Sequence, residues 1–122
     1  MKVISLSKKL EIKNLFKEGK RVYKEHLNVV YLFRNYDDET LIYMKIAYVV
    51  SKKISTKAVF RNKIKRRMRM AVQQVLKENE EKFNELRSSV LVAIRPASDK
   101  IIEASYHQIY LEIKQSLGQL IR

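Results

Sequence analysis

The sequence of 122 residues contains no cysteine, a single proline and only two glycines. The absence of cysteine excludes disulfide bonds, a thiolate nucleophile and a cysteine-based zinc site, and it fits the reducing cytoplasm. Because glycine and proline are so few, long flexible linkers are not expected. No apolar run is long enough to cross a bilayer, and no signal-peptide core follows the N-terminal lysines. These absences favour a single cytoplasmic domain over residues 1–122.

Acidic residues are missing from one long stretch, residues 41–77. This stretch contains eleven lysines and arginines, in a chain whose formal net charge is +13. The acids gather instead at residues 37–39 and 78–85. A dense block of cations repels itself unless a polyanion neutralises it, so the pattern predicts a binding surface. Nucleic acid is the favoured partner, and an anionic membrane surface is the alternative.

Hydrophobic periodicity predicts a chain of mixed helices and strands. We expect helices at residues 7–17, 56–83 and from 105 onward, and strands at 27–33, 41–50 and 88–95. The run at 41–50 forms either one strand or two shorter ones, and the polar residues 34–40 have a length that fits a hairpin. The order is then roughly α-β-β-β-α-β-α. It predicts an α+β fold, a single-domain α/β sandwich with helices on a small mixed sheet.

Two helix ends carry local signals. Gly19 is expected to end the first helix in a left-handed conformation. Ser105 and Gln108 have the spacing of a capping box, which predicts the start of the last helix. Apolar residues then recur at spacings of three and four and predict one buried face: Tyr106, Ile109, Tyr110, Ile113, Leu117 and Leu120.

The acid-free stretch is amphipathic when it is placed on a helix at about 100° per residue. One arc of this helix contains Ile64, Met68, Ala71, Val72 and Val75. The adjoining arc contains Arg61, Asn62, Lys65, Arg66 and Arg69. An apolar face argues against a disordered tail and predicts a docked helix with a row of cations facing outward. The Asn62 amide suits a ribose or a base edge, and on local grounds it is equally well explained as a capping or turn residue.

A solvated basic face is the alternative explanation of this row. Arg61, Lys65 and Arg69 have no acidic partners four residues away to relieve their mutual repulsion. Cations near the start of a helix also oppose its dipole. These costs favour a surface that phosphates neutralise on binding, and the planar arginine side chain suits both phosphates and bases.

A protein that cleaved nucleic acid by itself would need converging carboxylates for metal ions, or a histidine acid–base pair. His26 and His107 are far apart in sequence, and the acids at residues 37–39 are adjacent in a predicted turn, where their side chains do not converge. No phosphate-binding loop, dinucleotide motif or Ser-His-Asp arrangement is present. The sequence therefore predicts no catalytic residue and no metal ligand in the protein.

The order of residues along the basic helix resembles one known family. SKK at residues 51–53, followed by AVFRNKIKRRMRMA at 58–71, resembles the signature of the protein component of bacterial ribonuclease P, an R-N-R-x-K-R-x-x-R pattern on a central helix. KKLEIKNLFKEGKRV at 8–22 resembles the N-terminal helix of the family, and VLVAIRPAS at 90–98 resembles its last strand. Lys63 stands where the pattern has arginine, which keeps the charge and loses the planar fork.

The resemblance implies an RNA-binding subunit with a ribosomal-protein-like fold and a left-handed β-α-β crossover. In this family a catalytic RNA, with its Mg²⁺ ions, removes the 5′ leader from precursor tRNA. The resemblance further implies that the protein is a monomer in a 1:1 complex with that RNA. By position, the residues expected to contact the RNA subunit are Lys52, Lys53, Arg61, Asn62, Lys63, Lys65, Arg66 and Arg69.

The resemblance also implies a separate cleft for the single-stranded leader, between the sheet and the N-terminal and central helices. Its expected residues are Ile12, Phe16, Val30, Tyr31 and Tyr48. Aromatic platforms suit single strands because any base can stack on them. Ile12 stands where many members have an aromatic residue, and Phe16 is also explained as a core residue. The alternative functions are a ribosomal or RNA-chaperone protein, which would not affect leader removal, and a protein metallonuclease.

Overall fold

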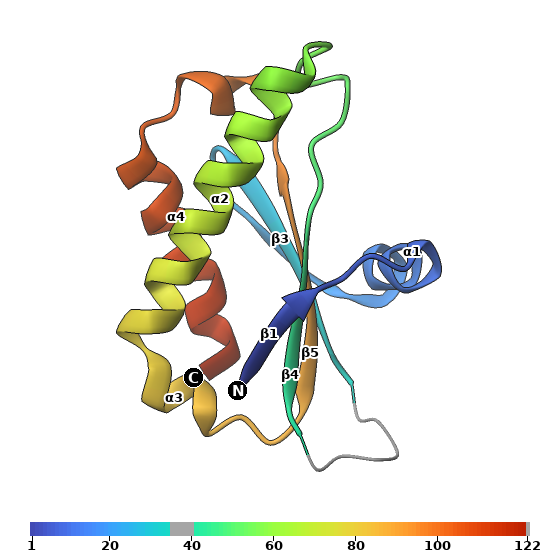
Figure 1. The fold of residues 1–122 in the computed structure, drawn as a ribbon, viewed down its shortest axis with the longest axis vertical. Coiled ribbons are helices and arrows are strands. Elements are labelled where there is room, and N and C mark those ends of the chain that lie inside the picture. Colours follow the sequence, from blue (N-terminus) through green and yellow to red (C-terminus); the bar gives the residue numbers. More distant parts are fainter. Residues whose placement is uncertain (35–40, 122) are drawn as a thin grey trace.

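The computed structural model describes residues 1–34 and 41–121, which form helices packed on both faces of one sheet (Figure 1). The strands are β1 (Lys2–Ser5), β2 (Lys20–Tyr23), β3 (Leu27–Arg34), β4 (Tyr43–Tyr48) and β5 (Ser89–Pro96). The helices are α1 (Lys9–Glu18), α2 (Ala58–Glu78), α3 (Glu80–Asn84) and α4 (Tyr106–Gly118), with short 3-10 turns η1 (Asp99–Glu103) and η2 (Gln119–Ile121). Helices α2 and α4 cover one face of the sheet and α1 lies on the other, so the predicted α+β sandwich is confirmed.

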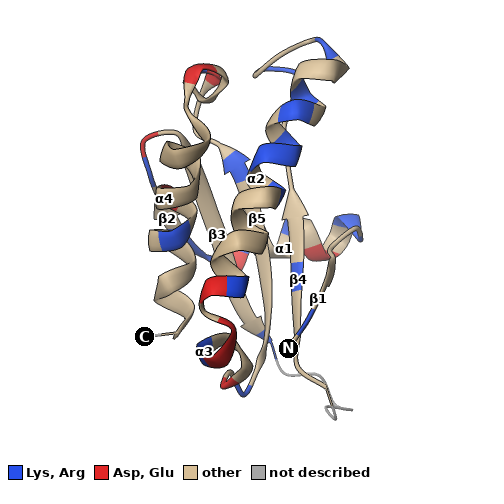
Figure 2. Ribbon diagram, turned by 60° about the vertical axis from the view of Figure 1, so that its left-hand side comes forward, with Lys and Arg blue, Asp and Glu red and all other residues tan. Residues whose placement is uncertain are grey.

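The sheet has the strand order β1-β4-β5-β3-β2. Strands β4 and β5 are parallel neighbours, and α2 connects them across one face. In Figure 2, α2 lies in front of the sheet, and the parallel strands β4 and β5 both point upward. Strand β5 lies to the left of β4, so the chain moves leftward as it passes through α2. The crossover is therefore left-handed, as the resemblance implied and against the usual preference for right-handed connections.

The expected hairpin between β3 and β4 is wrong, because β5 lies between these two strands. Val92 in β5 is opposite Tyr31 in antiparallel β3 and opposite Ile46 in parallel β4. The predicted turn at residues 34–40 lies outside the described residues, except for Arg34, which ends β3. Residues 43–48 form one strand and not two. The expected order has three strands before α2, and the structure has four. The two strands that the sequence analysis missed are β2 and the four-residue edge strand β1.

Gly19 follows α1, but the reason for a glycine differs from the one predicted. Its φ is −70° and its ψ is 156°, so the backbone is extended and not left-handed. A Cβ atom at this position would lie 2.4 Å from the carbonyl oxygen of Leu15 and 2.6 Å from Cγ1 of Val30. Glycine is required here because α1 ends in close contact with β3.

The helix expected over residues 56–83 is interrupted. It begins at Ala58 and ends at Glu78, and the separate helix α3 follows after Asn79. Asn79 has a φ of −124°, and its side-chain Nδ2 donates to the carbonyl oxygen of Val75 at 2.9 Å. An asparagine side chain that bonds a carbonyl of the preceding turn competes with the helical pattern and favours the break.

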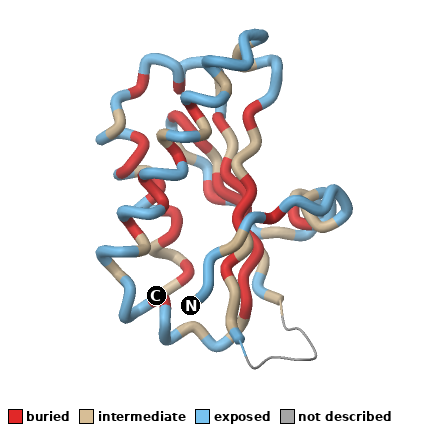
Figure 3. Tube along the Cα trace, viewed as in Figure 1, coloured by how far each residue is buried: buried red, intermediate tan, exposed pale blue. Residues whose placement is uncertain are grey.

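The main core lies between the sheet and the two helices α2 and α4, where buried residues concentrate in Figure 3. The predicted apolar arc of α2 is confirmed: Ile64, Met68, Ala71, Val72 and Val75 are all buried. The apolar face of α4 is confirmed in the same way, except that Tyr106 is only half-buried. A second, smaller core forms under α1 from Leu6, Leu15, Val30, Ala47, Leu91 and Ala93.

The capping box at the start of α4 is confirmed as well. The Ser105 hydroxyl accepts from the backbone N–H of Gln108 at 3.1 Å, and the Gln108 side chain accepts from the backbone N–H of Ser105 at 2.9 Å. In the described part of the chain, no helix is long and apolar enough to cross a membrane.

Candidate nucleic-acid interface

The first half of α2 carries a concentrated positive charge, while acids gather at its end and on α3 (Figure 2). We call Arg61, Asn62, Lys63, Lys65, Arg66 and Arg69 the α2 cationic face. All six side chains are exposed or half-buried, and none forms an ion pair with a described acid. Five of them, with Val59, line one open concavity: Asn62, Lys63, Lys65, Arg66 and Arg69. The face can therefore receive an anion.

Arg61 differs from the other cations of this face because its side chain holds the chain that precedes the helix. Its Nη1 donates to the carbonyl oxygens of Ser55 at 3.0 Å and Thr56 at 2.9 Å. Lys52 and Lys53 lie on the exposed turn just before this segment. Arg61 thus fixes the connection that places the two lysines near the start of α2, and its remaining N–H groups are available to an anion.

Arg69 lies over an aromatic ring of the sheet. Its guanidinium carbon is 5.3 Å from the centroid of the Tyr48 ring, within the range of a cation–π contact. Burial raises the pKa of the Tyr48 phenol to about 12, and the charge of Arg69 opposes that rise. The phenol therefore remains a neutral donor throughout the physiological pH range.

The five residues expected to line the leader cleft do not lie together. Val30 and Tyr31 are consecutive in β3, and side chains alternate between the two faces of a strand. Val30 is buried in the smaller core under α1, while Tyr31 is buried in the main core on the opposite face. Tyr48 also packs against the main core. Only Ile12, Phe16 and Val30 share the α1 side, so Tyr31 and Tyr48 do not belong to a cleft with Phe16.

A groove on the α1 side of the sheet contains residues that the sequence analysis missed. It has a volume of about 520 Å³ and is lined by Asn28, Val49, Ser51, Lys53, Ile54, Arg95 and Pro96 to Asp99. We call it the α1-side groove. Arg95 connects it to α1, because the guanidinium carbon lies 4.8 Å from the centroid of the half-buried Phe16 ring. A lone arginine near the end of the apolar strand β5 was the available sequence signal.

Lys53 links the two surfaces. It belongs to the turn that leads into α2, and it also lines the α1-side groove. Arg21 in β2 holds the C-terminal turn of α1, since its Nη2 donates to the carbonyl oxygen of Phe16 at 2.5 Å. Phe16 packs against the smaller core, as its core explanation predicts, and it also lies under Arg95, while its contact with the leader stays a prediction.

The two histidines have structural partners. His26 Nδ1 lies 2.5 Å from Oε2 of Glu112, and the other oxygen of this carboxylate accepts from the backbone N–H of His26 at 2.8 Å. The His107 ring stacks on Tyr110. Within the described ranges, no group of three histidines or acids is placed to hold a metal ion. The acids at 37–39 lie outside those ranges, so the absence of a protein active site stays a prediction.

Known proteins resemble this chain along almost its whole length. A family model described as Ribonuclease P matches residues 1–121. A ribonuclease P protein component from Bacillus pumilus is 32% identical over 117 residues, which cover 96% of this chain and 84% of that protein. The solved RNase P protein of Staphylococcus aureus has a TM-score of 0.67 at 20% identity and covers 97% of both chains. That of Thermotoga maritima has a TM-score of 0.65 at 22% identity, covering 97% of this chain and 96% of its own. At such low identities, the two structures establish the fold alone.

Proposed function

This chain belongs to the Ribonuclease P family, and from that premise we propose that it holds a catalytic RNA on the α2 cationic face and the 5′ leader of precursor tRNA in the α1-side groove. The observation that carries the proposal is the docked helix α2, whose first three turns contain no acid. Its apolar arc is buried and its cations face outward. A helix of this kind stays ordered while its charge is available to phosphates.

The energetic role of the cationic face is the neutralisation of phosphates. Each phosphate that a lysine or arginine neutralises releases counterions from the RNA, which favours binding at low salt. The protein also lies between two polyanions, the RNA subunit and precursor tRNA, and lowers their mutual repulsion. Lys52 and Lys53 extend this field from the helix toward the α1-side groove.

The α1-side groove suits a single strand better than a duplex. Phe16 and Arg95 form a cation–π pair at one side of it, and both a ring and a guanidinium plane can stack on bases of any sequence. Asn28 supplies an amide and Lys53 a charge within the same groove. Ile12 packs against the smaller core on the same side of the sheet and offers no aromatic surface.

The chemistry in this proposal belongs to the RNA, which binds most of the Mg²⁺ and hydrolyses the phosphodiester bond. The protein contributes binding and orientation, as one monomer per RNA in the cytoplasm. The chemistry of the α2 cationic face supports this division, because lysine, arginine and asparagine side chains are not the oxygen-rich ligand set that Mg²⁺ prefers.

Reconstitution tests the proposal. The purified protein alone should leave precursor tRNA intact. With the RNA subunit of the same organism at low Mg²⁺, it should increase the rate of leader removal and the affinity for precursor over mature tRNA. Equal rates with and without the protein would overturn the assignment. Tight RNA binding without any change in cleavage would favour a ribosomal or chaperone-type role, and cleavage without RNA would favour a metallonuclease.

A further inference from the structure

A second groove lies on the opposite face of the sheet, between α2 and the edge strand β1. Its upper part has a volume of about 360 Å³ and apolar walls from Val3, Ile46, Val72 and Leu76. The same part is lined by Ser5, Tyr48, Arg69 and Gln73. We call it the β1-edge groove. Strand β1 contributes one wall because it pairs with β4 on one side only and ends the sheet.

The upper part of this groove offers unused hydrogen-bonding groups. Across residues 1–34 and 41–121, the side chains of Ser5, Tyr48 and Gln73 have no hydrogen-bond partner. Their hydroxyls and amide include both donors and acceptors. An apolar cleft with a few converging polar groups is the usual form of a small-ligand site.

Arg69 joins this groove to the α2 cationic face. It lines both concavities, one with Asn62, Lys65 and Arg66 and the other with Tyr48. A nucleotide whose phosphate lies on the cationic face therefore has its base within reach of the groove. The planar guanidinium of Arg69, held over the Tyr48 ring, is a surface on which a base can stack.

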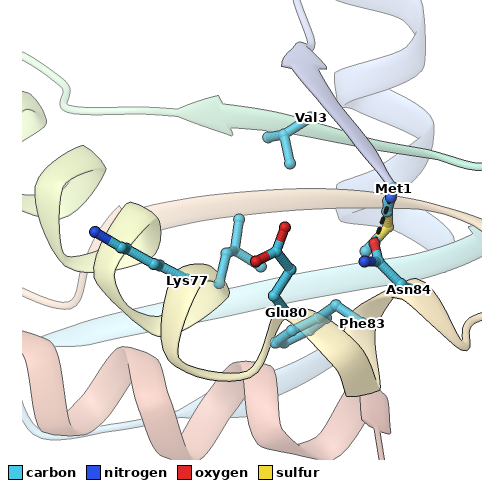
Figure 4. A pocket seen from close by; sticks show the side chains of 7 residues that line it. Met1, Val3, Lys77, Glu80, Phe83 and Asn84 are labelled. Atoms are coloured by element: carbon cyan, nitrogen blue, oxygen red, sulfur yellow. Dashed lines mark hydrogen bonds between the residues drawn. The ribbon is translucent and has the colours of Figure 1, made fainter.

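The lower part of the groove differs in charge from the upper part. Val3 and Leu76 also line this part, together with Met1, Lys77, Glu80, Phe83 and Asn84. Figure 4 shows the carboxylate of Glu80 beside this pocket and the Met1 amine bonded to Asn84. The lining of the lower part has mixed charge, because the Glu80 carboxylate lies there together with Lys77 and the Met1 amine, whereas the upper part has no acid in its lining and includes Arg69. The upper part, which shares Arg69 with the α2 cationic face, is therefore the part that suits a nucleotide of a bound RNA.

We propose that the upper part of the β1-edge groove receives one unpaired base of the RNA that lies along the α2 cationic face. The base stacks on Arg69, its edge meets Gln73 and the hydroxyls of Ser5 and Tyr48, and its phosphate stays on the helix. This inference rests on the proposed function, because it assigns a base-binding site to the RNA interface. The site is separate from the α1-side groove, since the sheet lies between them.

Two uncharged substitutions of Gln73 test the site. Gln73 is exposed on α2, so Gln73→Ala removes the amide and Gln73→Trp fills the groove with little effect on the core. Met70→Trp is the matched control, because Met70 is also exposed on α2 and lines neither concavity. The reconstituted RNA–protein complex is probed by base methylation of the RNA, and the affinity is measured as a function of salt.

We expect the wild-type protein to protect one unpaired base of the RNA subunit, and both Gln73 variants to restore its reactivity. Gln73→Trp should weaken RNA binding roughly fivefold or more, the loss of one stacked base. The slope of log K against log salt should not change, because neither substitution of Gln73 alters the charge of the protein. Met70→Trp should behave as wild type. If Gln73→Trp keeps the wild-type affinity and protection pattern, the base site is wrong while the proposed function stands. A wild-type protein that neither binds nor stimulates the RNA would overturn the proposed function itself.

Discussion

The guanidinium of Arg95 lies over the ring of Phe16, with 4.8 Å between its central carbon and the ring centroid. Arg95 lies in β5 and Phe16 lies in α1, two elements that are far apart in the sequence. Their contact brings a stacking surface and a positive charge together at the α1-side groove. Either residue alone has an ordinary structural explanation, but the pair forms a surface suited to a single strand.

Replacing Phe16 should reduce the preference for precursor over mature tRNA. In Phe16→Ala, the stacking surface is lost and Arg95 has no ring beneath it. We expect precursor affinity to fall roughly fivefold or more, in line with about 1–3 kcal/mol per stacked base, while affinity for mature tRNA stays the same. Leu10→Ala is the control, because Leu10 lies on the same helix and is 76% exposed. Equal losses for both tRNAs would contradict the placement of the leader in this groove.

Replacing Arg66 should affect the RNA subunit instead. Arg66 is exposed on the α2 cationic face, so Arg66→Ala removes one phosphate contact. The affinity for the RNA subunit should fall, and the slope of log K against log salt should decrease in magnitude by about 1. Arg87→Ala makes the same change of charge at an exposed site beyond α3 and should leave the slope unchanged. If the two variants have equal slopes, the face does not hold phosphates.

The two glycines should respond to alanine in opposite directions. In Gly19→Ala the new methyl group would collide with the Leu15 carbonyl and the Val30 side chain, so we expect destabilisation by about 1–3 kcal/mol. At Gly118, in the last turn of α4, a Cβ meets nothing within 4 Å. Gly118→Ala should therefore stabilise the protein by about 0.5–1 kcal/mol. Denaturant unfolding measures both changes, and a neutral Gly19→Ala would refute the close approach of α1 to β3.

Tyr48 should make the stability fall at high pH. Its pKa is about 12 in the folded protein, mainly because of burial, against about 10 for an unperturbed tyrosine. The folded state thus keeps a proton that the unfolded state loses. The contribution of this phenol to the free energy of unfolding is complete below pH 10, and it disappears as the pH rises toward 12. Removing Arg69 should raise this pKa further, because its charge lowers it.

Tyrosinate absorbance measures this titration. The difference between the wild type and Tyr48→Phe isolates one phenol among the seven tyrosines of the chain. A midpoint near 10 in that difference would show that Tyr48 is not buried as described. Because Tyr48 lines the β1-edge groove, the titration also tests the burial of one residue of that groove without any RNA present.

Local patterns predicted the parts of the fold that depend on near neighbours. The apolar arc of α2 and the capping box of Ser105 and Gln108 were both found in the sequence because helical contacts connect residues three or four apart. The position of β5 between β3 and β4 could not be found this way. The apolar sequence of β5 indicates that the strand is buried, but it does not indicate which strands are its neighbours.

The candidate site shows the same division. The charge and spacing of the α2 cationic face were visible, but the bonds from Arg61 to the Ser55 and Thr56 carbonyls were not. The leader residues were grouped by resemblance, and the alternation of side chains along β3 separated Tyr31 from Val30. The contact of Arg95 with Phe16 joins two elements whose proximity depends on the whole sheet.

The strand order also has a consequence for the synthesis of the chain. Strands β1 and β4 form one pair and β2 and β3 another, and only β5, at residues 89–96, joins the two pairs. The chain as far as residue 96, the end of β5, must therefore leave the ribosome before a continuous sheet can form. Pairings that wait for a distant segment slow folding and leave edges exposed. We therefore expect the nascent protein to become resistant to protease only after β5 has left the ribosome.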